Sequence, residues 1–96
     1  MTFQWDQTKN AKNLRKHGLS FEDALHVFSD PFAVTRADQH EEESRWQIIG
    51  QMEACHILLV AYTQRDWDDE LIIRIISARK TTAQERRAYE NSQRFS

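Results

Sequence analysis

Residues 71–90 read LIIRIISARKTTAQERRAYE, and they set the arrangement of the whole chain. The first half is an apolar, β-branched run interrupted only by Arg74, which is typical of a strand inside a sheet with both faces largely covered. At a period of two residues, Arg74 and Lys80 point to one face of this strand and Arg79 points to the other. Arg74 requires a partner or a ligand, because burying an unpaired arginine costs free energy.

The second half of this stretch predicts a helix. Thr82 and Glu85 have the spacing of a capping box, in which the Thr82 hydroxyl accepts a hydrogen bond from the backbone N–H of Glu85. The Glu85 carboxylate accepts one from the backbone N–H of Thr82 in return. We expect the helix to run to about Asn91.

A short strand at residues 2–5 and a helix are expected at the start of the chain. Asp6 or Thr8 can cap this helix, which runs to about His17. Gly18 follows, and glycine readily adopts the left-handed conformation that ends many helices. Lysine and arginine are in excess here, so the helix is strongly basic.

A second helix is expected from Ser20, with Asp23 three residues further on, and it should end at or before Asp30. Strands are expected at residues 32–36, 45–52 and 56–63, with a polar connection at 37–44 and a turn at 64–70. The resulting order β-α-α-β-β-β-β-α predicts an α+β fold. Helices at both ends cover a small antiparallel sheet, and the last strand lies inside it.

Size and composition indicate a single domain over residues 1–96. Hydrophobic residues make up 40% of the sequence and charged residues 29%, as in soluble globular proteins. Cys55 is the single cysteine, so no disulfide can form within the chain. The sequence has no apolar run long enough for a signal peptide or a membrane span. We therefore expect a cytoplasmic protein without membrane contact.

The net charge of −2 conceals a separation of charge along the chain. Residues 1–17 carry four cations against one acid, residues 18–70 three arginines against twelve acids, and residues 71–96 six cations against two acids. If the two basic ends meet in space, they form a positive surface suited to phosphate groups. Ordinary solvated helix faces would give the same pattern.

A cluster of cations on two expected strands is the main candidate for a functional site. Its members are Arg45, Arg74, Arg79 and Lys80. Guanidinium groups match phosphate oxygens in pairs and stabilise charge that develops on them. With His17 as a proton-transfer group, the cluster suits cleavage of RNA through its own 2′-hydroxyl. The structural alternatives are ion pairs with the central acids and, for His17, a favourable position at a helix end.

The motifs of metal and nucleotide sites are absent from the sequence. Three glutamates follow His40, but the HExxH pattern requires a second histidine where Ser44 stands. Cys55 and His56 point to opposite faces of an expected strand, so they form neither half of a zinc site nor a nucleophile–base pair. P-loop, GxGxxG and GxSxG motifs are also missing. We expect no metal and no cofactor.

The chain resembles the BrnT family, the ribonuclease toxins of bacterial type II toxin–antitoxin systems. The resemblance covers nearly the whole chain and rests on two segments in this order and at this separation, KHGLSFEDA at residues 16–24 and RIISARK at residues 74–80. Further matches are Trp5, Asp6, Arg45, Gly50, Glu85 and Tyr89. Thr81 departs from the pattern, in which alanine is usual, and this affects only the start of the expected helix.

This resemblance implies a RelE-like α+β fold and an endoribonuclease that stops translation without a metal ion. It also implies neutralisation by a small BrnA-like antitoxin protein, through which alone the toxin would contact DNA. The residues that it places at the site are His17, Arg74 and Arg79 for catalysis and Arg45, Lys80 and Tyr89 for RNA binding.

A non-catalytic module is the alternative function, namely a degenerate toxin that binds nucleic acid or a partner and acts as a co-repressor with an antitoxin. The acidic middle of the chain argues against direct binding of duplex DNA, which a net basic domain would favour. RNA cleavage in the presence of a chelator would separate the two functions.

Overall fold

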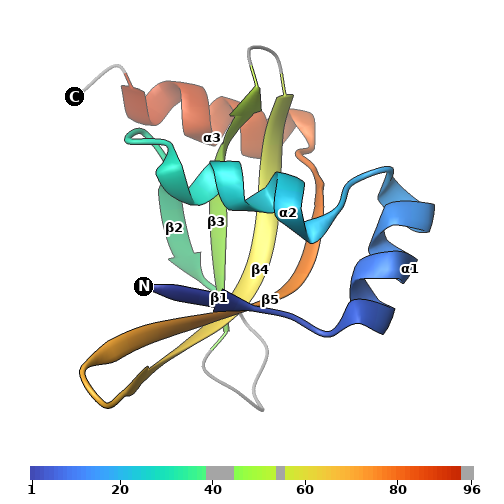
Figure 1. Ribbon diagram of the computed structural model, residues 1–96. Helices are drawn as coiled ribbons and strands as arrows, with labels where there is room; N and C mark the ends of the chain where they lie inside the picture. Colours follow the sequence, from blue (N-terminus) through green and yellow to red (C-terminus); the bar gives the residue numbers. More distant parts are fainter. Residues whose placement is uncertain (39–44, 54–55, 94–96) are drawn as a thin grey trace.

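Three helices, a short 3₁₀ segment and a five-stranded sheet make up the computed structural model, which describes residues 1–38, 45–53 and 56–93 (Figure 1). The elements are β1 (Thr2–Gln4), α1 (Gln7–His17), α2 (Phe21–Ala24), the 3₁₀ segment η1 (Leu25–Ser29), β2 (Val34–Ala37), β3 (Arg45–Glu53), β4 (His56–Trp67), β5 (Glu70–Lys80) and α3 (Ala83–Gln93). The α+β class and the order of helices and strands agree with the prediction. The second helix differs in that its last part is 3₁₀.

The strand order is β1-β5-β4-β3-β2, so β5 lies inside the sheet as predicted. Neighbouring strands are antiparallel except β1 and β5, which run parallel with Phe3 opposite Ile73. The sheet is therefore mixed and not purely antiparallel. Most of the chain separates β1 from β5, so no tight turn imposes an antiparallel direction on this pair.

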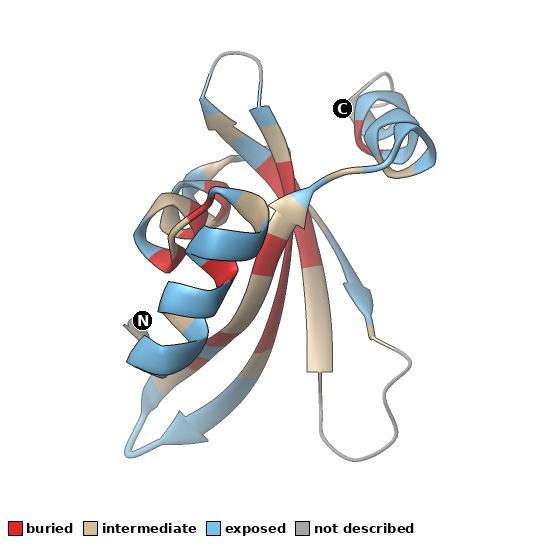
Figure 2. Cartoon of the chain, turned by 90° about the vertical axis from the view of Figure 1, so that its right-hand side faces the viewer, coloured by how far each residue is buried: buried red, intermediate tan, exposed pale blue. Residues whose placement is uncertain are grey.

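Helices cover the two faces of the sheet unequally (Figure 2). On one face, α1, α2 and η1 enclose the larger core, whose largest fully buried side chains are Phe21, Val27, Leu58, Val60 and Ile75. On the other face, α3 covers one end of the strands and buries a smaller cluster of Ile49, Leu59 and Tyr89. No helix in the described part of the chain is long and apolar enough to cross a membrane.

Capping boxes begin α2 and α3 as predicted. The Ser20 hydroxyl accepts a hydrogen bond from the N–H of Asp23 at 3.1 Å, and the Asp23 carboxylate accepts one from the N–H of Ser20 at 3.2 Å. Thr82 and Glu85 form the equivalent pair at 3.2 and 2.9 Å. At the end of α1, Gly18 adopts the expected left-handed conformation with φ of 70°.

The hairpin between β4 and β5 is longer than the sequence indicates. β4 continues to Trp67, and the turn consists of Asp68 and Asp69 alone in place of residues 64–70. These two aspartates have φ of 53° and 65°, the left-handed conformation that a two-residue type I′ turn requires and that aspartate tolerates. The sequence predicts a turn over these residues because the segment is rich in acids, and aspartate and glutamate are uncommon in strands.

A β-bulge in β5 changes which side chains share a face. Tyr62 of β4 pairs with Ile75, but the preceding residue, Ala61, pairs with Ser77, so Ile76 is the extra residue. An extra residue in one strand reverses the alternation of side chains beyond it.

The bulge places Arg74 and Arg79 on the same face of the sheet. Ile75 before the bulge and Ala78 after it both enter the larger core, although strict alternation assigns them to opposite faces. Arg74 and Arg79 therefore lie on the α3 face, and Lys80 lies on the other. The prediction that Arg74 shares a face with Lys80 was wrong, because the sequence does not reveal the bulge.

Asn13 joins α1 to β5 inside the core. Its side-chain amide donates hydrogen bonds to the carbonyls of Leu19 and Ala78, both at 2.9 Å, and its oxygen accepts one from the N–H of Ala78 at 3.1 Å. β1 ends at Gln4, opposite Arg74, so the edge of β5 beyond that point is free for this contact. Asn13 thereby holds the basic helix α1 beside the sheet.

Candidate functional site

Arg45 and Arg74 lie in one row across the α3 face. Arg45 of β3 pairs with Thr63 of β4, and Thr63 pairs in turn with Arg74 of β5. Gln4 of β1, which pairs with Arg74, completes the row. Paired residues direct their side chains to the same side of a sheet, so strand register holds the two arginines on either side of Thr63.

The row forms part of a hollow of about 400 Å³, which we call the Arg74 hollow. Its lining residues are Gln4, Lys9, Arg45, Thr63, Gln64, Arg65, Ile72, Arg74 and Ile76. Among the described lining residues, four are cations and none is an acid. Within the described residues, none of the four cations forms an ion pair. Asp6, the N-cap of α1, lies close enough to interact electrostatically with Lys9 and Arg74, but the four described cations outnumber it, so the hollow stays positive and favours anionic groups.

Arg74 is exposed, in contrast to the expectation of a strand covered on both faces. The reason is that α3 lies over the end of the sheet near Ile49 and Leu59 and leaves the end near Arg74 uncovered (Figure 2). Water hydrates the guanidinium there, so Arg74 needs no buried acidic partner.

A second hollow of about 310 Å³, which we call the α1 hollow, lies between α1 and β5. Its ionisable side chains come from one face of α1 and are Lys9, Lys12, Lys16 and His17. Lys9 and Ile76 line both hollows, so the two adjoin. His17, half-buried in the last turn of α1, borders the α1 hollow and not the Arg74 hollow.

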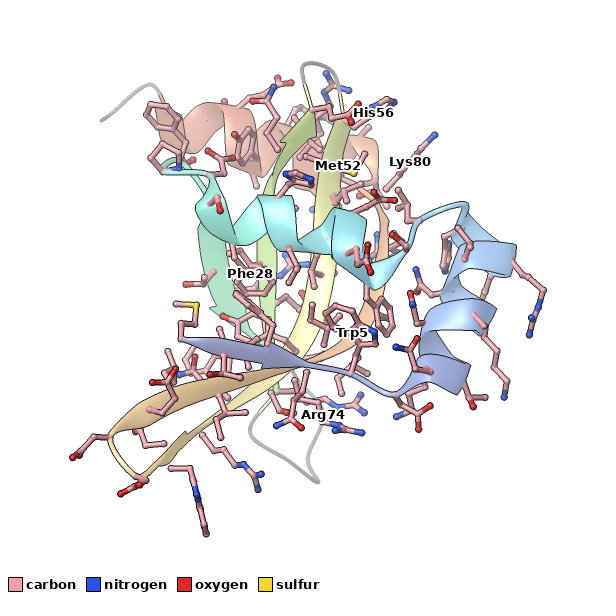
Figure 3. All side chains as sticks on the ribbon, in the orientation of Figure 1. Trp5, Phe28, Met52, His56, Arg74 and Lys80 are labelled. Carbon is pink, nitrogen blue, oxygen red and sulfur yellow. The ribbon has the colours of Figure 1, made fainter. Side chains whose placement is uncertain are left out.

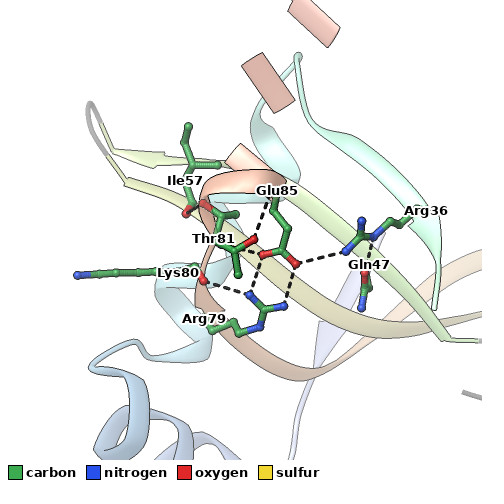
Figure 4. Close-up of polar contacts among 8 residues, drawn as sticks. Arg36, Gln47, Ile57, Arg79, Lys80, Thr81 and Glu85 are labelled. Atoms are coloured by element: carbon green, nitrogen blue, oxygen red, sulfur yellow. Dashed lines mark hydrogen bonds and ion pairs between the residues drawn. The ribbon is translucent and has the colours of Figure 1, made fainter. Parts of the chain in front are cut away.

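Arg79 is engaged at the start of α3 (Figure 4). Its guanidinium donates two hydrogen bonds to the Glu85 carboxylate at 2.8 and 2.9 Å, and Arg36 of β2 donates a third at 3.3 Å. The hydrogen bonds from Arg79 lower the pKa of Glu85 to about 2, and Glu85 raises the pKa of Arg79. The two donors with which Arg79 would bind a phosphate are thus occupied by a carboxylate.

Lys80 is exposed at the far end of β5 from Arg74 (Figure 3). Five residues of β5 lie between the two, and six steps along a strand span about 20 Å. Lys80 also points to the opposite face of the sheet. The expected convergence of four cations is therefore wrong in part, because strand register brings Arg45 to Arg74 while Arg79 and Lys80 lie elsewhere.

Tyr89 is buried between α3 and the sheet with 2% of its surface exposed. Its hydroxyl donates a hydrogen bond to the Asp30 carboxylate at 2.6 Å. Burial alone would raise the pKa of Asp30, but the hydrogen bonds from Tyr89 and from the backbone N–H groups of Gln51 and Phe32 lower it. Tyr89 is placed to stabilise the fold, and an RNA contact would require it to leave this site.

Reasoning from the sequence missed several residues of the site. Those that line the Arg74 hollow are Gln4, Lys9, Thr63 and Arg65, and those that surround Arg79 are Arg36 and Glu85. Strand register is the signal that would have found Gln4, Thr63 and Arg65, because it places them in or beside the row of Arg45 and Arg74. Lys9 and Glu85 lie on helices, and only the packing of α1 and α3 brings them to the site.

The described residues include no group of three or more His, Cys, Asp or Glu side chains that could hold a metal ion. His40 and the three glutamates after it, which invited a metal interpretation, lie outside the described residues. Cys55 also lies outside them, so its orientation relative to His56 stays a prediction.

The family model described as "Ribonuclease toxin, BrnT, of type II toxin-antitoxin system" matches residues 5–85. The chain belongs to the BrnT family. Among solved structures, it is similar to the 1.1 Å crystal structure of the Brucella abortus ribonuclease toxin BrnT, with 25% identity and a TM-score of 0.61. That match covers 85% of this chain and 97% of the Brucella abortus chain. No curated protein matches the sequence.

The part of the chain that matches the BrnT family model contains almost the entire site. It includes His17, Arg45 and Arg74 and every residue of the Arg74 hollow except Gln4. Tyr89 lies beyond its end. The Arg74 hollow therefore lies almost entirely within the region that this BrnT chain shares with the family of ribonuclease toxins.

Proposed function

We propose that this protein is a metal-independent endoribonuclease that cleaves single-stranded RNA at the Arg74 hollow. The observation that carries the proposal is the placement of Arg45 and Arg74 on either side of Thr63, in a hollow whose described lining has four cations and no acid. A phosphodiester brings a negative charge to this site, and guanidinium groups donate paired hydrogen bonds to its oxygens.

The reaction that suits these groups uses the 2′-hydroxyl of the RNA as the nucleophile. The 2′-oxygen forms a bond to the adjacent phosphorus while the bond from phosphorus to the 5′-oxygen breaks. A proton leaves the 2′-oxygen and another joins the 5′-oxygen, which gives a 2′,3′-cyclic phosphate and a 5′-hydroxyl. Negative charge grows on the phosphate oxygens during this step, and Arg45 and Arg74 stabilise it because strand register fixes their positions.

We assign the proton transfer to His17. Of the histidines in the described part of the chain, His17 borders a hollow that adjoins the Arg74 hollow. His56 lies at the other end of the sheet from Arg74 (Figure 3), and His26 lines a separate hollow with Met52 and Glu53. An imidazole gains and loses a proton near neutral pH, as this step requires. Lys9, which lines both hollows, would bind a phosphate oxygen between them.

Arg79, Lys80 and Tyr89 take other roles in this proposal. Glu85 occupies the paired donors of Arg79, so Arg79 anchors the start of α3. Lys80 faces away from the Arg74 hollow, and Tyr89 supports the core. Catalysis then rests on Arg74, with Arg45 and His17.

As a member of a type II toxin–antitoxin family, the protein has RNA as its substrate and an antitoxin protein as its partner. We propose that cleavage of RNA in the cytoplasm stops translation. A BrnA-like antitoxin would neutralise the toxin by covering the Arg74 hollow, and DNA would be contacted only through that antitoxin.

Incubation of the purified protein with single-stranded RNA and an excess of EDTA tests the proposal. Cleavage should continue at an undiminished rate, and the products should end in a 2′,3′-cyclic phosphate and a 5′-hydroxyl. His17→Gln should slow cleavage without loss of RNA affinity. Activity that stops in EDTA and returns with a divalent cation, or products that carry a 5′-phosphate, would contradict the mechanism.

A non-catalytic binding module is the second candidate function, and the engagement of Arg79 by Glu85 favours it. A toxin in which a predicted catalytic arginine is neutralised could bind RNA and an antitoxin without cleaving RNA. Under this alternative, the purified protein binds RNA, and the RNA stays intact with or without EDTA.

A further inference from the structure

We propose that Trp67 is a stacking platform for a nucleobase of the RNA bound in the Arg74 hollow, an inference that rests on the proposed function. Trp67 lies at the end of β4, next to the turn of Asp68 and Asp69, and 67% of its surface is exposed. A single exposed hydrophobic side chain is ordinary on a protein surface. The argument therefore depends on where this indole lies relative to the hollow.

Trp67 lies on the same face of β4 as Thr63 and Arg65. These three residues alternate at a period of two, and they pair with Arg74, Ile72 and Glu70 of β5 without irregularity. Thr63 and Arg65 line the Arg74 hollow, so Trp67 is the next side chain on this face beyond its edge. An RNA strand held by Arg74 and Arg65 would place a flanking base over Trp67.

The charges near Trp67 favour an uncharged base over a phosphate. Glu70, opposite Trp67, pairs with the N-terminal amino group at 2.8 Å and accepts a hydrogen bond from Thr2. The other acids of the hairpin are Asp66, which points to the opposite face, and the turn residues Asp68 and Asp69. A phosphate would be repelled there, so the backbone would stay on the cations while a base stacks on the indole.

Phe32 provides a matched control, because it is also an exposed aromatic side chain, with 51% of its surface exposed. It borders a separate hollow between β2 and α3, whose described lining has no cation. A hollow with cations that can hold an RNA backbone thus adjoins Trp67, whereas the described hollow beside Phe32 has none.

The test is the affinity for a short single-stranded RNA that carries 2′-fluoro groups and therefore lacks the internal nucleophile, measured by fluorescence anisotropy. Trp67→Ala should weaken binding by about five- to 150-fold, the effect of losing one base–aromatic stack. Trp67→Phe should restore most of the affinity, and Phe32→Ala should leave it unchanged. The dependence of affinity on salt should stay the same in Trp67→Ala, because stacking releases no counterions.

Arg74→Ala separates failure of this inference from failure of the proposed function. If Arg74→Ala weakens RNA binding and lowers its salt dependence while Trp67→Ala binds as the wild type does, the stacking inference is overturned and the Arg74 hollow stands. If neither variant changes RNA binding, both are overturned. If Trp67→Ala loses affinity for the antitoxin but not for the RNA, Trp67 serves a protein interface and the inference is equally overturned.

Discussion

Arg45 and Arg74 face the same side of the sheet, each paired with Thr63 on the strand between them. Backbone hydrogen bonds between the strands set this arrangement, and neither arginine forms an ion pair with a described residue. Substituting either arginine therefore removes charge from the hollow without breaking a contact that the fold needs. This separation of stability from function allows each to be tested by its own set of variants.

Glu85→Gln should lower the free energy of unfolding by about 1–2 kcal/mol at neutral pH, because it weakens the contacts with Arg79 and Arg36 in a partly exposed site. Folding lowers the pKa of Glu85 from 4.5 to about 2, so its stabilisation is complete above about pH 5 and is lost as the pH falls toward 2. Urea denaturation of both proteins over this range should show their difference shrinking in acid.

Glu90→Gln is the matched control on the same helix, because Glu90 pairs with Arg86 at 3.0 Å and both side chains are about half exposed. Its effect should stay within about 0.5 kcal/mol. Equal stabilities of Glu85→Gln and Glu90→Gln at neutral pH would show that the contacts of Glu85 stabilise the protein no more than the half-exposed pair of Arg86 and Glu90 does.

Asn13→Ala should destabilise the protein by roughly 2–4 kcal/mol, because it leaves the backbone N–H and carbonyl of Ala78 without their hydrogen bonds in the core. Asn91→Ala, at an exposed position of α3, should change stability little. Thermal unfolding followed by circular dichroism compares the two. Similar melting temperatures would mean that the link between α1 and β5 does not depend on Asn13.

Tyr89→Phe should reduce stability by about 1 kcal/mol, the contribution of the hydrogen bond to Asp30, and should leave RNA affinity unchanged. Denaturation and RNA binding are measured on the same preparation. A fall in RNA affinity with full stability would restore the RNA-contact role that the resemblance to the family implies for Tyr89.

Antitoxin binding should compete with RNA and weaken as salt rises, because both ligands would occupy the cations of the Arg74 hollow. Arg74→Ala should weaken antitoxin binding, and Arg86→Ala on α3 should not. Titration calorimetry at several salt concentrations provides the measurement. A stable complex of toxin, antitoxin and RNA would place the antitoxin elsewhere.

The order of elements could be predicted because its signals are local. The capping boxes at Ser20 and Thr82, and Gly18 at the end of α1, act over three or four residues and appear as the sequence indicates. The cations of the site could also be predicted from a local pattern, because Arg74 interrupts an apolar run.

The geometry of the site could not be predicted, because it depends on register between distant strands. One extra residue, Ile76, reverses the faces of Arg79 and Lys80 relative to Arg74. The partner of Arg79 is Glu85, which the sequence indicates only as a helix cap. The incomplete cover of the second face by α3, which exposes Arg74, is likewise a consequence of packing.

Cleavage of RNA by Arg74→Lys tests most directly whether Arg74 binds the scissile phosphate. Lysine keeps the charge but loses the planar pair of donors, so the rate should fall by about 10²- to 10³-fold while the melting temperature stays that of the wild type. Arg86→Lys, at an exposed site of α3, should cleave at the wild-type rate. A folded Arg74→Lys protein that cleaves RNA as fast as the wild type would contradict the assignment of the Arg74 hollow as the catalytic site.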